Sequence, residues 1–399
     1  MRIVGLAVAM TALPVLAATY RVDSVRQRYP WNGLVDIDYT VTSAAGEQAP
    51  DPSQAWLALS VTDEATGETF AANAHGGPLP TAAGRHQIVW NAAADGRTDV
   101  SASLKATLKL VTMPEKYVVI DLSGGHYATR FNVSYLDAPP AGGFNTPEYK
   151  TKKLVLRYIP AGSFIMGSPA DEPGHAQSPA REVQHPVAIS RPFYFSLFEL
   201  TRAQFETISG RTATNESGLG DLRPFDNFNS TTFRGEAEDV TSFKIPGSLS
   251  AKTGLSFDYP TDAQWEYVCR AGTTAARYTG VCTDADLNTI ARWKNTTAGD
   301  NRHPGCHTDV GTYAPNPWGI YDLYGNVWEF TRDYFVDAAH ELSPVDPCQA
   351  VRPVSGMQDR TVRGGSYGSE ANSCRSAFRS YYDQRTSAGG YGYRLVIQL

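Results

Sequence analysis

Cysteine is the residue type with the most distinctive chemistry in this 399-residue chain. The five cysteines, all in the C-terminal half, are Cys269, Cys282, Cys306, Cys348 and Cys374. Thiols tend to pair as disulfides in an oxidising compartment, and an odd count leaves at least one unpaired within a monomer. Cys306 also lies close to His303 and His307, two further potential zinc ligands. The cluster has no recognisable fourth ligand, so disulfide formation and metal binding both stay open for Cys306.

The composition excludes some classes of partner. The chain has 35 Lys and Arg against 41 Asp and Glu, a net charge of −6, and no run of like charges. Nucleic-acid-binding domains carry a basic surface, so we expect no nucleic-acid partner. The 21 Tyr, 16 Phe, 7 Trp and 35 Gly indicate a loop-rich globular protein with aromatic anchors.

Residues 1–18 have the features of a secretory signal peptide. Arg2 supplies a positive charge, an apolar stretch follows from Ile3 to Leu16, and Val15 to Ala18 offers small residues for cleavage. The apolar stretch is shorter than the roughly 20 residues of a membrane-spanning helix. The alternative is a buried N-terminal strand or helix. We expect an exported protein, periplasmic or extracellular, that does not span the membrane.

Short alternating segments separated by turns fill residues 19–115. Strands are predicted at 34–41, 55–61, 86–90 and 103–111, with turn clusters at 65–67 and 76–78. This spacing is typical of an all-β sandwich with immunoglobulin-like architecture. No catalytic cluster occurs there, so we expect a spacer or interaction module, and a carbohydrate-binding role stays open.

Residues 116–150 are predicted to connect this module to a second domain at 151–399. They contain a strand at 117–122 and a Pro-Gly-rich break at 138–143. The second domain is irregular, with two predicted helices. One begins after Thr201 and the other after Thr261, each of which is expected to act as N-cap.

Four segments of residues 151–399 resemble, in order, the motifs of the formylglycine-generating enzyme (sulfatase-modifying factor) family. They are 159–168 with 185–187 and 198–201; 259–273; 318–330; and 362–367 with 374–379 and 392–396. The resemblance implies an α+β, loop-rich, C-type-lectin-like fold in which much loop surrounds a small sheet core.

The third motif also implies calcium. Calcium takes six to eight oxygen ligands, and carboxylates and turn carbonyls supply them. By resemblance the ligands are the side chains of Asp322 and Glu329 and the carbonyls of Gly325 and Val327. The alternative is a buried turn in which both carboxylates accept backbone hydrogen bonds.

Active relatives oxidise a cysteine of an unfolded sulfatase with oxygen, at a copper ion held by two thiolates after the Gly-Gly-Ser motif. Soft thiolates select Cu(I). Here the first copper position falls on Ser369 and only Cys374 remains, so we expect no copper site. The residual pocket implied by the resemblance comprises Ser366, Trp328, Ser369 and Arg379. Fold maintenance is the alternative for these residues.

The resemblance also implies a Cys269–Cys374 disulfide. Such a bridge contributes about 4–5 kcal/mol in the chain-entropy model because it closes a long loop. Cys282 and Cys306 then form a second pair, and Cys348 stays free.

Two classes of function follow. The first is an oxidoreductase-type modifying enzyme for protein substrates, with Cys348 or Cys374 as a reactive thiol. The second is a catalytically silent module that binds a protein or peptide ligand, because fold does not fix function. The segment 366–393 is rich in Tyr, Ser, Asn, Gly and Arg, a composition typical of adaptable binding surfaces. Core packing is the alternative for its aromatics, and a structural surface protein is a third class. The sequence does not set the oligomeric state.

Overall fold

The computed structural model describes residues 19–43, 55–72, 79, 83–93, 97, 100–112, 116–175, 180–213, 220–234, 244–295, 306–353 and 358–399. The chain divides after Thr112 into two compact units. The predicted signal peptide, residues 1–18, lies outside the described residues. No helix in the described ranges combines the length and apolar character needed to cross a membrane.

The first unit contains two three-stranded antiparallel sheets around one apolar core. One sheet has the order β1 (Thr19–Gln27), β2 (Leu34–Thr42), β5 (Gly84–Asn91), and the other has β4 (Thr69–Ala71), β3 (Ala55–Asp63), β6 (Leu104–Thr112). Along β2 every second residue is buried, which is the alternation that predicted this strand. Val35 and Ile37 of β2 share the core with Leu57 of β3 and Trp90 of β5. The four predicted strands are confirmed, and the immunoglobulin-like topology stays a prediction.

A six-stranded sheet forms one part of the second unit. Its order is β13 (Ser256–Asp258), β18 (Val396–Gln398), β12 (Phe193–Ser196), β9 (Lys153–Ile159), β7 (Tyr117–Asp121), β8 (Asn132–Leu136). Every neighbouring pair is antiparallel. Residues 116–150, which the sequence predicts as a connecting segment, therefore supply two strands of this sheet and α1 (Pro147–Thr151). They are part of the second unit.

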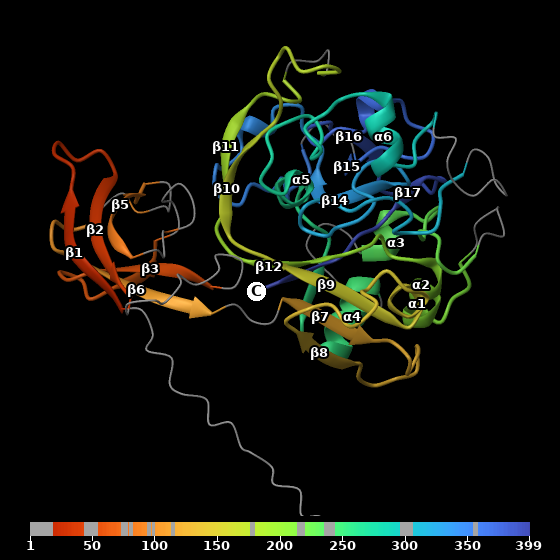
Figure 1. The fold of residues 1–399 in the computed structure, drawn as a ribbon, viewed down its shortest axis with the longest axis horizontal. Helices are drawn as coiled ribbons and strands as arrows, with labels where there is room; N and C mark the ends of the chain where they lie inside the picture. The colour runs from red at the N-terminus through yellow and green to blue at the C-terminus, as the bar shows by residue number, and fades with distance from the viewer. Residues whose placement is uncertain are drawn as a thin grey trace, which may run out of the picture. The chain divides into compact units, whose positions relative to one another are not determined.

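A smaller four-stranded sheet carries the C-terminal motifs. Its order is β16 (Ser380–Asp383), β15 (Asp359–Arg363), β14 (Trp328–Tyr334), β17 (Tyr391–Gly392), and β17 runs parallel to β14. The hairpin of β10 (Gly162–Met166) and β11 (His185–Ile189) packs against α5 (Asp262–Arg270), which also contacts β14 and β15. Figure 1 shows α5 between this hairpin and the four-stranded sheet.

Both predicted helices are confirmed, with their caps. The Thr201 hydroxyl accepts from the Gln204 N–H at the start of α2 (Arg202–Ser209), and Gln204 reaches back to the Thr201 N–H. Thr261 and Gln264 form the same capping box at α5. The described residues also form four helices that the sequence did not predict: α1, α3 (Ser230–Arg234), α4 (Ile245–Thr253) and α6 (Asp284–Ile290). Short 3-10 turns occur at Ala339–Glu341 and Ala371–Ser373.

Candidate functional site at the Gly-Gly-Ser turn

A serine pair closes the turn that follows β15. Gly364 and Gly365 have φ values of 89° and 81°, which side-chain-bearing residues rarely adopt, so the two glycines allow the sharp turn. The Ser366 N–H donates to the Ser369 hydroxyl at 2.8 Å, and the two hydroxyl oxygens lie 3.2 Å apart. The Ser369 N–H donates to the Ser366 carbonyl at 2.9 Å. Both serines are only 9% exposed, so the structure brings these two predicted site residues together.

Cys374 lies against the same turn. Its Sγ is 2.9 Å, and the Ser369 Cβ 3.4 Å, from the point where a Cβ on Gly365 would stand. Positions 369 and 374 are therefore neighbours in space. The Cys374 side chain is fully buried, and burial raises the pKa of its thiol to about 12. In the absence of a metal, burial therefore favours the neutral thiol of Cys374 over the thiolate at neutral pH.

Trp328 lies next to Gly390, the residue that precedes β17. It is half-buried at the start of β14, and its N–H donates to the Gly390 carbonyl at 2.8 Å. A Cβ on Gly390 would stand 3.7 Å from the Ser366 hydroxyl, so Trp328 and Ser366 both adjoin this glycine. The Trp328 ring lies 6.5 Å from Tyr391 and nearly parallel to it, and 6.0 Å from Phe378.

Arg379 belongs to a different environment from the other predicted pocket residues. It is buried, and its Nε donates to Asp262 Oδ2 at 2.7 Å while Nη1 donates to the Val336 carbonyl at 2.9 Å. Arg363 holds the other Asp262 oxygen and donates to Glu266 Oε2 at 2.6 Å. The fold-maintenance alternative therefore describes Arg379, because its guanidinium is committed to an ion-pair network.

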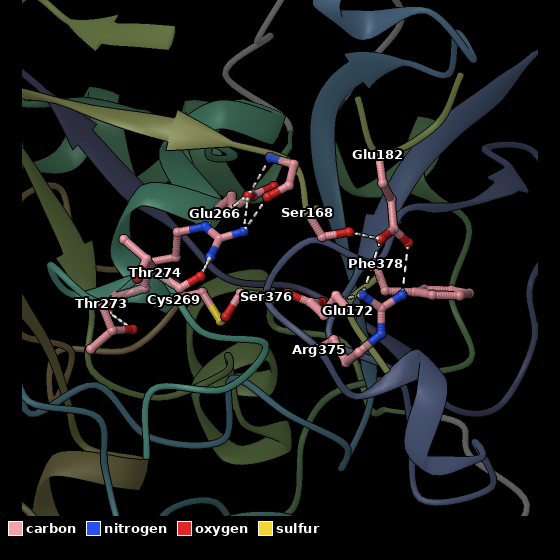
Figure 2. A network of polar contacts seen from close by, with 12 residues as sticks. Ser168, Glu172, Glu182, Glu266, Cys269, Thr273, Thr274, Arg375, Ser376 and Phe378 are labelled. Atoms are coloured by element: carbon pink, nitrogen blue, oxygen red, sulfur yellow. Dashed lines mark hydrogen bonds and ion pairs between the residues drawn. The ribbon is translucent and has the colours of Figure 1, made fainter. Parts of the chain in front are cut away.

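Arg375, the arginine of the Cys-Arg-Ser segment, forms another buried network, as Figure 2 shows. Arg375 donates to Glu172 Oε1 at 2.6 Å and to both oxygens of Glu182, at 2.8 and 3.0 Å. Ser168 donates to Glu182 at 2.6 Å. All four side chains are buried, so the two carboxylates depend on Arg375 and on hydrogen bonds within the protein for their stabilisation. The network fixes the segment that carries Cys374 and Ser376.

Neither predicted disulfide is formed, because all five cysteines are free thiols. The Cys269 sulfur lies 3.7 Å from the Ser376 hydroxyl, and burial raises the pKa of Cys269 to about 12. Cys374, two residues before Ser376, faces Gly365 instead. The family resemblance implies that Cys374 faces Cys269 on α5, but the residue that contacts Cys269 is Ser376. Cys282, Cys306 and Cys348 are half-buried.

The predicted calcium ligands do not fit a calcium site in this arrangement. Both Glu329 oxygens accept from the Arg394 guanidinium at 2.6–2.9 Å, and one also accepts from Trp265 Nε1 at 2.7 Å. Asp322 Oδ2 accepts from the Gly311 N–H at 2.5 Å, while its Oδ1 has no partner. Among the described residues, no group of three or more His, Cys, Asp or Glu side chains is placed to hold a metal ion. Arg394 is the cation that balances Glu329.

Glu199 is a buried carboxylate of the same cluster that the sequence reasoning did not assign. It accepts from Asn326 Nδ2 at 2.6 Å and from the Val327 N–H at 3.3 Å. Burial, together with the charges of Asp322 and Glu329, raises the pKa of Glu199 well above its ordinary range, and burial raises that of Asp322 to about 6. In the sequence, the one indication of a role for Glu199 was its position in the Phe-Glu-Leu-Thr part of the first motif.

Asp226 and His307 form a second unassigned pair next to the serine turn. His307 Nε2 lies 3.5 Å from Asp226 Oδ2, which accepts from the Gly390 N–H at 2.8 Å. Both side chains are at most 5% exposed, and Asp226 Oδ1 and His307 Nδ1 have no hydrogen-bond partner among the described residues. The Tyr367 ring lies 5.9 Å from the His307 ring, and burial followed by the Asp226 charge raises the pKa of Tyr367. His303, the other histidine of the predicted zinc cluster, lies outside the described residues.

The C-terminal aromatics divide between core and surface. Tyr393 is fully buried, whereas Tyr381 is 42% exposed. Tyr382 and Tyr391 are half-buried and stack with ring centroids 4.0 Å apart, which continues the row that begins at Trp328. Core packing therefore accounts for only part of this segment.

The second unit resembles known proteins. Residues 144–399 match the family described as the sulfatase-modifying factor enzyme 1-like domain. The chain is 35% identical over 147 residues to the formylglycine-generating enzyme of Streptomyces coelicolor, covering 34% of this chain and 45% of that protein. It therefore spans less than half the length of that relative.

Two mammalian relatives and one solved structure extend the comparison. The chain is 27% identical over 317 residues to the formylglycine-generating enzyme of Bos taurus, covering 65% of this chain and 78% of the relative. It is 24% identical over 249 residues to the inactive C-alpha-formylglycine-generating enzyme 2 of Mus musculus, covering 52% and 78%. The structure of PvdO from Pseudomonas aeruginosa has a TM-score of 0.52 at 22% identity, covering 61% of this chain and 94% of that one. This last likeness supports the expected fold.

Proposed function

The chain belongs to the family of sulfatase-modifying factor enzyme 1-like domains. We propose that it is an exported member that binds a protein or peptide ligand and does not carry out copper-dependent oxidation of that ligand. The binding surface is the aromatic row of Trp328, Tyr391 and Tyr382 beside the serine turn. The signal peptide at residues 1–18 supports export, and the first unit acts as an immunoglobulin-like spacer or interaction module.

The donor set at positions 369 and 374 carries this proposal. Cu(I) selects soft thiolate ligands, and a serine hydroxyl is not one. Ser369 accepts from the Ser366 backbone N–H, so its oxygen already closes the turn. Cys374 is buried with its thiol pKa raised to about 12, which disfavours the thiolate. These residues do not fit a copper ion, and no step of the proposed function passes through one.

The aromatic row supports ligand binding. Trp328, Tyr391 and Tyr382 are half-buried, and their mutual stacking limits their rotamers before any ligand arrives. Rigid aromatic side chains supply contact area at low entropic cost, and Trp and Tyr are the residues most often dominant in interfaces. The mouse relative is named as an inactive formylglycine-generating enzyme, so the family includes a protein described as lacking that activity.

Peptide display followed by affinity measurement tests the proposal. Peptides selected on the purified wild-type protein are measured by fluorescence anisotropy against Trp328→Ala and Tyr391→Ala, with Tyr135→Ala as a matched control. Tyr135 is 42% exposed, whereas Trp328 and Tyr391 are half-buried, and it lies on β8 of the six-stranded sheet. We expect at least about fivefold weaker binding for the first two variants, corresponding to about 1 kcal/mol, and no change for the control. Equal effects in all three would overturn the proposal.

A proton-transfer enzyme is the second function, favoured by one observation. The Asp226–His307 pair lies beside Ser366 and Tyr367 and leaves one nitrogen and one carboxylate oxygen unpartnered. Such a pair is suited to hold or pass a proton at a reacting group. Turnover of a selected peptide that is lost in His307→Gln while binding is retained would favour this function over silent binding.

A further inference from the structure

A cavity of about 270 Å³ opens beside the C-terminal end of α2, where α3 and α4 adjoin it. Phe205, Phe228 and Phe233 line it together with His126, Arg211 and Lys244. No residue of the serine turn or of the aromatic row at Trp328 contributes to this lining. The cavity is therefore separate from the proposed peptide-binding surface, and nothing in the proposed function assigns it a role.

The cavity has an apolar aromatic wall that the core holds rigid. Phe205 and Phe233 are at most 2% exposed. Phe205 stacks on Phe225 with centroids 3.6 Å apart, and Phe233 stacks on Tyr393 at 3.9 Å. The Tyr393 hydroxyl in turn donates to the Phe228 carbonyl. Because each ring is fixed by another ring behind it, the wall is preformed for a flat apolar group.

Two cationic side chains, Arg211 and Lys244, also line the cavity. Arg211 is exposed and Lys244 is half-buried. Lys252 adds a third positive charge beside the lining, since its Nζ donates to the His126 carbonyl at 2.7 Å. Among the residues that the structure describes, no Asp or Glu lines the cavity. This local excess of positive charge lies on a chain whose net charge is −6.

The wall and the charges together define a ligand class. We propose that the cavity binds a small carboxylate with a single-ring or branched apolar body, with the body on the phenylalanines and the carboxylate between Arg211 and Lys244. Ligand pockets combine an apolar lining with a few polar groups that fix orientation, as here. The volume of about 270 Å³ is just below the range of about 300–1,000 Å³ for drug-sized ligands, which favours one ring over two.

Calorimetric titration of the full chain tests this proposal. The probes are phenylacetate, benzoate and isovalerate, with the neutral phenylacetamide as the matched control ligand. The variants are Lys244→Met and Arg211→Met, with Lys152→Met as a control because Lys152 is exposed on the same unit but does not line the cavity. Thermal melting of each variant verifies that it is folded.

We expect saturable one-to-one binding of at least one carboxylate. Loss of one charge-assisted hydrogen bond weakens binding by about tenfold, so each cavity variant should show that loss and Lys152→Met should not. Binding of phenylacetate and phenylacetamide with equal affinity would overturn the carboxylate assignment. Absence of saturable binding by all three carboxylates would overturn the site. Because Trp328 does not line the cavity, these outcomes are independent of the peptide-binding test.

Discussion

Replacement of Arg375 by Met is predicted to destabilise the second unit strongly. The guanidinium makes hydrogen bonds to Glu172, to both oxygens of Glu182 and to the Gly174 and Asn372 carbonyls. Glu172 and Glu182 are 9% and 1% exposed, so the variant leaves two buried carboxylates without this counter-charge. Breaking a buried ion pair by removing one partner costs about 3–5 kcal/mol. We expect a loss of that size in the free energy of unfolding at pH 7.

Native-state hydrogen exchange is the suitable assay, because the chain has two units and need not unfold in one step. Peptides from β14 and β15 report the opening free energy of the second unit alone. Arg385→Met is the matched control, since the Arg385–Asp383 pair has a 2.8 Å contact but its side chains are 58% and 34% exposed. An exposed pair contributes about 0–1 kcal/mol. Arg375→Lys provides a folded comparison if Arg375→Met does not fold.

The pH dependence gives this prediction a sign. Burial already raises the pKa of Glu172 above its ordinary value, with Arg375 acting in the opposite direction. Without Arg375 this pKa rises further, so the folded variant gains a proton more readily than the unfolded chain as pH falls. The destabilisation of Arg375→Met should therefore shrink between pH 7 and pH 5. A loss below about 1 kcal/mol, equal to that of the surface control, would refute the reasoning.

Three further predictions concern buried groups of the second unit. Burial raises the pKa of Asp333 from 3.8 to about 6. The free energy of unfolding that this group contributes should therefore fall by on the order of 3 kcal/mol as the pH rises through that window. Urea unfolding at pH 4 and pH 7 should show that Asp333→Asn removes this pH dependence. A Cβ at Gly325 would overlap a carbonyl oxygen of the neighbouring segment at a φ of 72°, so Gly325→Ala should lower the melting temperature clearly more than Gly142→Ala, which has open space around it. Chelation of calcium should leave the melting temperature unchanged, because Arg394 already neutralises Glu329; a chelator-dependent drop would instead support the predicted calcium site.

The elements with strong local signals were predictable. The alternation along residues 34–41 identified β2, and Thr201 and Thr261 marked the first turns of α2 and α5. The helices α3, α4 and α6 have five to nine residues, too short to display a clear apolar period, and α4 contains Pro246 and Gly247. Residues 116–150 were predicted to be a connecting segment. They belong to the sheet because β7 pairs with β9, which lies more than thirty positions further along the chain and is not visible from local sequence.

The site was predictable only where its residues lie close in the sequence. Ser366 and Ser369 meet because a tight glycine turn joins them. Arg379 was placed in the pocket because a motif does not show which way an arginine points, and its partner Asp262 is 117 positions away. The disulfide prediction failed by two residues, since Ser376 rather than Cys374 faces Cys269. An irregular segment has no helical or strand repeat, so the sequence does not show in which direction each of its side chains points.

The most direct test of the proposed absence of copper chemistry is a Cu(I) titration in competition with a chromogenic chelator. It measures whether positions 369 and 374 together bind Cu(I). The reduced wild-type protein is compared with Ser369→Cys, which places a second thiol next to Cys374, and with Ser343→Cys, which adds a thiol at an exposed position of the same unit. We expect no stoichiometric binding by the wild type or by Ser343→Cys, and one tightly held Cu(I) per chain in Ser369→Cys. Binding of one Cu(I) by the wild type as tightly as by Ser369→Cys would contradict the proposed absence of copper chemistry.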